Sequence, residues 1–264
     1  MLKTPRALVL LALVWPAAAQ TTPADQEQAA RELISNAGRA LAARHAAVFL
    51  EALDRPLADQ LRKPVEALLQ RYDVQPSVDF LSVTGDGPGV AVSFDWKLSL
   101  TTREGQRAVT HREKRAACRV EWRAGAPRIT SFVGVFNAPA FLAPPDVDGA
   151  WDLLQSAARA LSQPDSPSAG FLAAFDSKLP AYEVLRSGAE TLAARGEVDS
   201  TIGLTSNEGT DTARTIEVDW TLEVVNSESR IRITQREAQL TFKIERRGKR
   251  WVIVSVTPLE FFQP

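Results

Sequence analysis

Residues 95–123 read DWKLSLTTREGQRAVTHREKRAACRVEWR, and residues 219–247 read DWTLEVVNSESRIRITQREAQLTFKIERR. The two stretches align without a gap at a constant offset of 124 residues, and nine of the 29 positions are identical. Repeats in solenoids and propellers recur at about 20 to 50 residues, so one long period predicts a duplicated domain. The identical pairs are Asp95/Asp219, Trp96/Trp220, Leu98/Leu222, Glu104/Glu228, Thr110/Thr234, Arg112/Arg236, Glu113/Glu237, Glu121/Glu245 and Arg123/Arg247.

In each half, a region where apolar residues have the spacing of helices precedes a region where they alternate as in strands. Apolar residues recur at three and four over 30–41 and 151–161, with further helical stretches at 49–53, 65–69, 171–175 and 185–192. Period two then predicts long strands with one wet face at 90–100, 110–122, 216–224 and 234–246, and shorter ones at 78–83, 129–136, 201–205 and 251–256. Helices followed by antiparallel strands predict an α+β fold, with the helices gathered on one face of a curved sheet.

The period also predicts the domain organisation. We expect a first domain over residues 20–142 and a second over 143–264, because a chain of this length with 45% apolar residues can build two cores. Residues 137–148 contain Pro139, Pro144 and Pro145, a composition typical of a short stiff linker.

The first 19 residues have the pattern of a signal peptide. Lys3 and Arg6 precede an apolar run over 7–15, and Ala17-Ala18-Ala19 forms a small-residue cleavage signal ahead of Gln20. An apolar run of roughly nine residues is too short for a bilayer, which needs about 20. We therefore expect an exported protein without a membrane span, periplasmic or secreted.

Charge and cysteine content exclude several classes of protein. Lys and Arg total 31 against 32 Asp and Glu, and loss of Lys3 and Arg6 leaves 29 against 32, a net charge of about −3. Such a chain lacks the basic field that attracts nucleic acid. With two His and one Cys, no zinc site of usual spacing is expected, nor any other cofactor. Cys118 matches Phe242 in the repeat and is expected to be a small buried hydrophobic residue.

Several motifs resemble a known superfamily. The stretch FLAAFD at 171–176, and Arg236-Glu237-Ala238 followed by Gly248-Lys249-Arg250-Trp251, are similar to exported bacterial members of the nuclear transport factor 2-like superfamily. The resemblance implies a cystatin-like cone in each half, with three helices in the mouth of a bent four-stranded sheet. That superfamily contains ketosteroid isomerases, polyketide cyclases and non-catalytic binding modules, so the fold alone assigns no reaction.

Residues suited to catalysis are few. His45, His111, Tyr72 and Tyr182 do not recur at matching positions in the other half. Strand parity places Asp95 and Asp219 on the wet face, outside the cone, and Asp54 and Asp176 follow apolar helical runs, where a helix-end or turn role is expected. No catalytic residue is therefore predicted.

One repeated pair remains as a candidate ligand-binding site. Pairing the central strands about a turn near Glu104 sets Trp96 opposite Arg112 and, in the second half, Trp220 opposite Arg236, all on the concave face. One interpretation is a cation-π brace, in which a guanidinium lies over an indole. The other is a binding site in which the same arginine meets an anionic group.

The resulting expectation is an exported, non-catalytic binding or interaction module whose partner is an unidentified small molecule or envelope protein. Two copies in one chain would let a monomer act as an intrachain pseudo-dimer. The alternative is an isomerase, cyclase or hydrolase-like enzyme acting on a small apolar molecule inside one cone. A deep pocket with a buried carboxylate or His would favour the enzyme, and a cone filled by Phe, Leu and Trp would favour the module.

Overall fold

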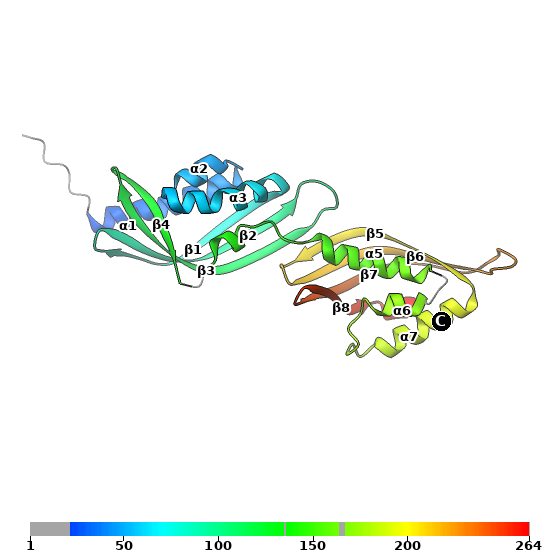
Figure 1. Ribbon diagram of the computed structural model, residues 1–264. Coiled ribbons are helices and arrows are strands. Elements are labelled where there is room, and N and C mark those ends of the chain that lie inside the picture. The colour runs from blue at the N-terminus through cyan, green and yellow to red at the C-terminus, as the bar shows by residue number, and fades with distance from the viewer. Residues whose placement is uncertain (1–21, 135, 164–166, 264) are drawn as a thin grey trace, which may run out of the picture.

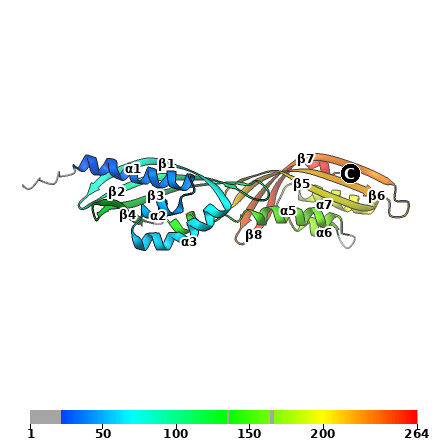
Figure 2. The same cartoon turned by 90° about the horizontal axis from the view of Figure 1, so that it is seen from above.

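A computed structural model describes residues 22–134, 136–163 and 167–263, so the expected signal peptide lies outside the described residues. The chain forms two halves that lie end to end in an elongated molecule (Figures 1 and 2). The first half consists of α1 (Pro23–Ala42), α2 (Ala46–Glu51), α3 (Arg55–Arg71), β1 (Tyr72–Asp86), β2 (Gly89–Thr102), β3 (Val109–Arg123), β4 (Ala126–Val133) and α4 (Ala138–Phe141).

The second half repeats this order, helices first and strands afterwards. It consists of α5 (Asp148–Leu161), α6 (Pro167–Leu172), α7 (Tyr182–Arg195), β5 (Glu197–Gly209), β6 (Ala213–Val225), β7 (Arg232–Arg247), β8 (Arg250–Thr257) and the 3-10 helix η1 (Leu259–Phe262). None of the helices in the described ranges is long and apolar enough to cross a membrane.

Local signals explain where the helices begin. Thr22 caps α1 through a capping box with Asp25, which satisfies backbone donors of the first turn. Asp54 caps α3, its carboxylate accepting a hydrogen bond from the Leu57 amide at 3.1 Å. Asp176 shapes a turn by accepting from the Lys178 amide at 3.0 Å. The helix-end and turn roles predicted for these two aspartates are therefore confirmed.

The described strands form one curved, eight-stranded sheet. Its order is β1-β2-β3-β5-β6-β7-β8, with β4 off this path and paired to β3. The α+β class is confirmed. The opening strands β1 and β5 are much longer than the expected 78–83 and 201–205, because Pro76 in β1 and Ser200 in β5 interrupt the apolar row of inward positions. β1 is an edge strand, which explains why it tolerates Pro76.

Irregularities of the sheet recur at the offset of 124 residues. An extra residue interrupts the pairing at Leu81 in β1 and at Thr205 in β5. A second interrupts it at Thr130 in β4 and at Val254 in β8. Bulges bend a strand and raise its local twist, so these two sites give both halves the same curvature.

Each half of the described chain has its own hydrophobic cluster. The first extends from Ala30 to Leu142 and the second from Ala150 to Phe262. Cys118 lies in the first with 1% of its surface exposed, as predicted, and burial raises the pKa of its thiol to about 12. The expected linker 137–148 is partly wrong, since α4 forms within it and packs on the first cluster. The expected strand 129–136 ends earlier, at Val133.

Candidate binding groove at the junction

The predicted pairing of tryptophan with arginine is wrong by two residues. Trp96 lies opposite Lys114, and Arg112 lies opposite Leu98. The second half shows the same register, with Arg236 opposite Leu222 and Trp220 opposite Ala238. A shift of two residues preserves strand parity, so Arg112 and Arg236 still project to the concave face, as predicted.

The β2–β3 loop explains the shift. Pairing ends at Thr101 and Val109, so the hairpin is centred on Gly105 and not on Glu104. Thr102 closes the loop, because its amide donates to the Ala108 carbonyl at 2.9 Å and its hydroxyl accepts from the Ala108 amide at 2.8 Å. Gly105 adopts a φ of 75°, a left-handed conformation that favours glycine.

Both arginines bind the last residues of their own half, which are α4 and the residues after it in the first half and η1 and the residues after it in the second. Nη1 of Arg112 donates to the carbonyls of Phe141 and Ala143 at 2.7 and 2.5 Å. Nη1 of Arg236 donates to the Phe261 carbonyl at 2.8 Å and also to the Gln263 carbonyl.

The cation-π brace is therefore wrong. In the part of the chain that the structure describes, the guanidinium groups over aromatic rings belong to Arg31, Arg71 and Arg246. Arg112 and Arg236 instead satisfy carbonyls at the C-terminal ends of α4 and η1, where helices lack internal donors.

Arg112 also connects the two halves. Its Nε and Nη2 each lie 2.7 Å from a carboxylate oxygen of Asp211, in the turn between β5 and β6. The Arg112 side chain is only 8% exposed, and Asp211 is 40% exposed. This bidentate pair holds the β5–β6 turn of the second half against the closing segment of the first.

A second arginine, Arg214, lies inside the junction with 3% exposure. It donates to the side chain and carbonyl of Asn207 at 2.5 and 3.0 Å, to the Val109 carbonyl at 2.8 Å and to the Thr110 hydroxyl at 3.0 Å. Burial lowers its pKa to about 10, so the guanidinium stays charged at neutral pH. Here β3 and β5 pair in parallel through Val109 with Glu208. Arg214 therefore joins the two halves into one continuous sheet.

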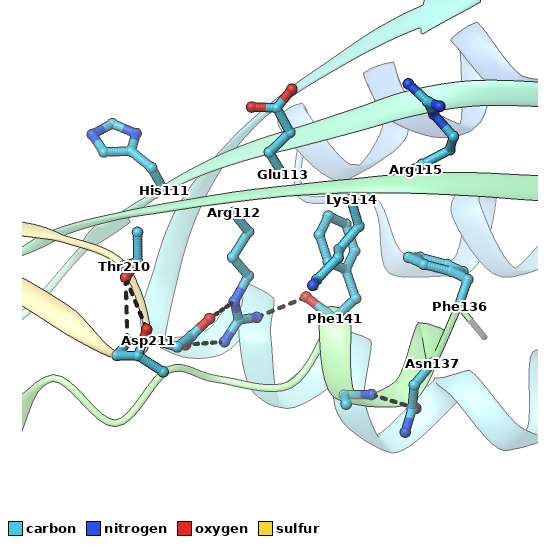
Figure 3. A pocket seen from close by; sticks show the side chains of 12 residues that line it. His111, Arg112, Glu113, Lys114, Arg115, Phe136, Asn137, Phe141, Thr210 and Asp211 are labelled. Atoms are coloured by element: carbon cyan, nitrogen blue, oxygen red, sulfur yellow. Dashed lines mark hydrogen bonds and ion pairs between the residues drawn. The ribbon is translucent and has the colours of Figure 1, made fainter. Parts of the chain in front are cut away.

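A groove of about 610 Å³ lies beside this junction. Figure 3 shows its floor and walls: β3 above, the β5–β6 turn with Asp211 at one end, and α4 with Phe141 below. Arg112 and Lys114 point from β3 toward Phe141, whereas Glu113 and Arg115 point to the other side of the strand (Figure 3). The volume falls in the range of small-molecule sites, on the order of 300 to 1,000 Å³.

The groove combines a cation with aromatic surface. Lys114 is exposed and, within the described ranges, has neither an ion-pair nor a hydrogen-bond partner. The ring centroids of Phe136 and Phe141 lie 5.3 Å apart, edge to face, and both residues line the groove. Arg115 is held by Asp95 at 3.0 Å, and the Arg112 fork is filled by Asp211. Lys114 is thus the cation that remains available to an anionic group.

The inside of the first cone offers far less space. The apolar void beside Trp96 has a volume of about 20 Å³, room for roughly one water molecule. The indole N–H of Trp96 is buried and has no hydrogen-bond partner among the described residues, whereas that of Trp220 donates to the Ser200 hydroxyl at 2.9 Å. Pro76 occupies the place of Ser200 in the first half and supplies no acceptor.

The other candidates for chemistry lie on the surface or in structural roles. His45 is exposed at the start of α2, and His111 lies 2.8 Å from Glu208 on the neighbouring half. The hydroxyl of Tyr72 donates to the Pro145 carbonyl at 3.1 Å. No cluster of His, Cys, Asp and Glu suited to a metal ion occurs among the residues that the structure describes.

The sequence did not predict a role at the junction or in the groove for Lys114, Phe136, Phe141, Asp211 or Arg214. Arg214 carried a usable signal, because it shares strand parity with Ile216, Val218 and Trp220 and so occupies an inward position. Lys114 carried the same signal, because it shares strand parity with Ala116 and Cys118. Asp211 carried none, since its partner Arg112 comes from the other half.

Comparisons with known proteins find similarity in fold. No family model matches the chain, and no curated protein matches it. Solved structures that resemble it include an NTF-2-like protein of unknown function from Shewanella oneidensis, 14% identical, covering 41% of this chain and 94% of that one, with a TM-score of 0.31. A protein of unknown function with a cystatin-like fold from Nostoc punctiforme is 18% identical over 42% and 87%, with a TM-score of 0.34.

A further solved structure extends over more of the chain. It is an Ntf2-like protein involved in plasmid conjugation, 8% identical, covering 80% of this chain and 85% of that one, with a TM-score of 0.23. These solved structures are described as NTF-2-like and cystatin-like, the kinds of protein that the sequence motifs resemble.

Proposed function

We propose that the chain is an exported, non-catalytic binding module, built by duplication of one cone-shaped domain, and that the junction groove is its binding site. The observation that carries the proposal is the contrast between the two spaces. The groove measures about 610 Å³ and presents Lys114, whereas the void in the first cone measures about 20 Å³.

The composition of the interior supports a module over an enzyme. In the described residues, the buried polar or charged residues are Thr110, Ser200, Asn207 and Arg214, which include no carboxylate or imidazole. Arg214 donates to five acceptor groups at the junction. A general base needs a titratable group within reach of a substrate pocket. An isomerase or cyclase acting in the first cone would have to open it first.

The recurrence of sheet features supports the duplication and its boundaries. The bulges, the strand register and the arginine that closes each half all recur at or near the offset of 124 residues. Two cones joined through one sheet would give a monomer that functions as a pseudo-dimer, with domains over 20–142 and 143–264.

An NMR screen with aromatic carboxylates such as benzoate and indole-3-acetate tests the binding site. We expect amide shifts along β3 near Lys114, no change at the Trp96 indole, and loss of binding in Lys114→Ala. Lys243→Ala is the matched control, because Lys243 is an exposed lysine on the equivalent strand β7. Shifts at the Trp96 indole that survive Lys114→Ala would instead favour an enzyme-like site inside the cone.

Export rests on residues 1–19 and has its own test. Mass spectrometry of the protein from a secreting bacterial host should show a mature terminus at or next to Gln20. An intact terminus at Met1 on protein recovered outside the cytoplasm would contradict the proposal of export.

A further inference from the structure

The groove follows an unpaired stretch of strand edge. On the side away from β2, β3 pairs with β5 only at Val109 and Thr110 and with β4 only from Ala117 onward. Within the described part of the chain, residues 111–116 therefore have a strand neighbour on one side alone. Among the described residues, no turn or side chain bonds their backbone from the open side.

The lining of the groove shows that it runs along this edge. Five consecutive residues of β3, from His111 to Arg115, line it. Successive side chains of a strand point to opposite faces, so a groove touched by five in a row lies beside the strand and not over one face. The main-chain N–H and C=O groups of the edge are therefore directed into the groove.

From this geometry we infer that the groove binds an extended polypeptide segment, which adds to β3 as a further strand between β4 and the β5–β6 turn. This inference rests on the proposed binding function of the groove and names its partner class. Six residues of strand span roughly 20 Å, so the site takes a segment of about six residues. Main-chain hydrogen bonds supply affinity in such strand addition, and side-chain contacts supply specificity.

The side chains beside the edge define the partner. Lys114 has no anionic partner in the described part of the chain, so it complements a carboxylate of the segment. The Phe136 and Phe141 rings offer apolar surface to a neighbouring side chain on the same face. The fitting segment therefore has an acidic residue and an aliphatic or aromatic residue two positions apart, and no proline at its centre.

The equivalent edge of the second half lacks these features. β7 pairs with β8 only from Thr241, so residues 235–240 also have one strand neighbour. Ala238 occupies the place of Lys114, however, and Gln239 that of Arg115. The second half thus provides an internal comparison with an open edge but without a counterpart of Lys114.

A displayed library of random octapeptides, selected against the full protein, tests the inference. We expect recovered peptides to carry the acidic and apolar pair and to bind Lys114→Glu at least about tenfold more weakly. Lys243→Glu makes the same charge change on the wet face of β7 and should leave binding unchanged. Recovery of no binding peptide, or equal binding to Lys114→Glu, would overturn the inference.

N-methylation of the peptide backbone distinguishes strand addition from other modes of binding. Only every second amide of an added strand bonds its neighbour, so methylation should abolish binding at alternate positions and leave the others unaffected. Amides on alternate residues of 111–116 should become protected from hydrogen exchange in the complex. Loss of binding without this alternation would contradict strand addition.

Two further outcomes separate this inference from the proposed function. Binding of aromatic carboxylates at Lys114 without any peptide binding would refute strand addition and leave the binding module intact. Concentration-dependent dimerisation in sedimentation, abolished by Lys114→Glu, would show that a second copy occupies the edge and would overturn the proposed partner.

Discussion

Single residues show how the same side chain serves two halves differently. Arg112 and Arg236 occupy equivalent places and both bind carbonyls of a closing segment. Only Arg112 also forms an ion pair with Asp211. The Arg112 guanidinium therefore bonds both the carbonyls of its own half and the Asp211 carboxylate of the other half.

This difference predicts unequal costs of truncation. Arg236→Ala should lower the free energy of unfolding by about 1–2 kcal/mol, through lost bonds to carbonyls and lost stem packing. Arg112→Ala should cost about 2–4 kcal/mol, because the Asp211 pair is lost as well. Urea denaturation of both variants measures this.

A double-mutant cycle isolates the pair. Arg112→Ala, Asp211→Ala and the double variant should give a coupling energy of about 1 kcal/mol, since Asp211 is partly exposed and regains water when its partner is removed. A coupling energy near zero would mean that the ion pair does not fix the junction.

Cys118 gives a second prediction at this scale. Burial raises the pKa of its thiol to about 12, so the reactive thiolate is nearly absent at neutral pH. We expect the folded protein to resist a thiol reagent at about pH 8, and the urea-unfolded protein to react with one equivalent. Rapid reaction of the folded protein would show that this strand position opens.

At the scale of elements, the parts governed by local pattern were predictable. Helix order, strand order and the face of each arginine follow from periodicity. Hairpin register did not follow, because it depends on how Thr102 closes its loop. The start of β1 was also missed, since Pro76 interrupts its apolar row of inward positions.

Strands β1 and β5 differ at one informative position. Ser200 on β5 accepts the indole N–H of Trp220, whereas Pro76 on β1 leaves Trp96 unsatisfied. Ser200→Ala should therefore cost about 1–2 kcal/mol of unfolding free energy by burying an unpaired donor. The control Ser77→Ala, exposed on β1, should change stability by less than about 0.5 kcal/mol. Equal effects of the two substitutions would contradict the assigned hydrogen bond.

At the scale of the whole molecule, the junction could not be read from the sequence. Its contacts join residues about 100 positions apart, such as Arg214 with Val109 and Thr110. The spacing of apolar residues along the chain does not reveal such pairs. The contact between Arg112 and Asp211, which are 99 positions apart, forms one end of the groove. The candidate site was consequently missed except for Arg112, whose role in it is structural.

The groove has a fixed shape only if Arg214 and the Arg112–Asp211 pair hold the halves in one orientation. Pulsed electron resonance between spin labels at Glu51→Cys and Glu190→Cys measures this, because both positions are exposed and Cys118 is buried. We predict one narrow distance distribution in the otherwise wild-type protein and a broad one when Arg214→Ala is added. A broad distribution without the Arg214 substitution would contradict a preformed groove.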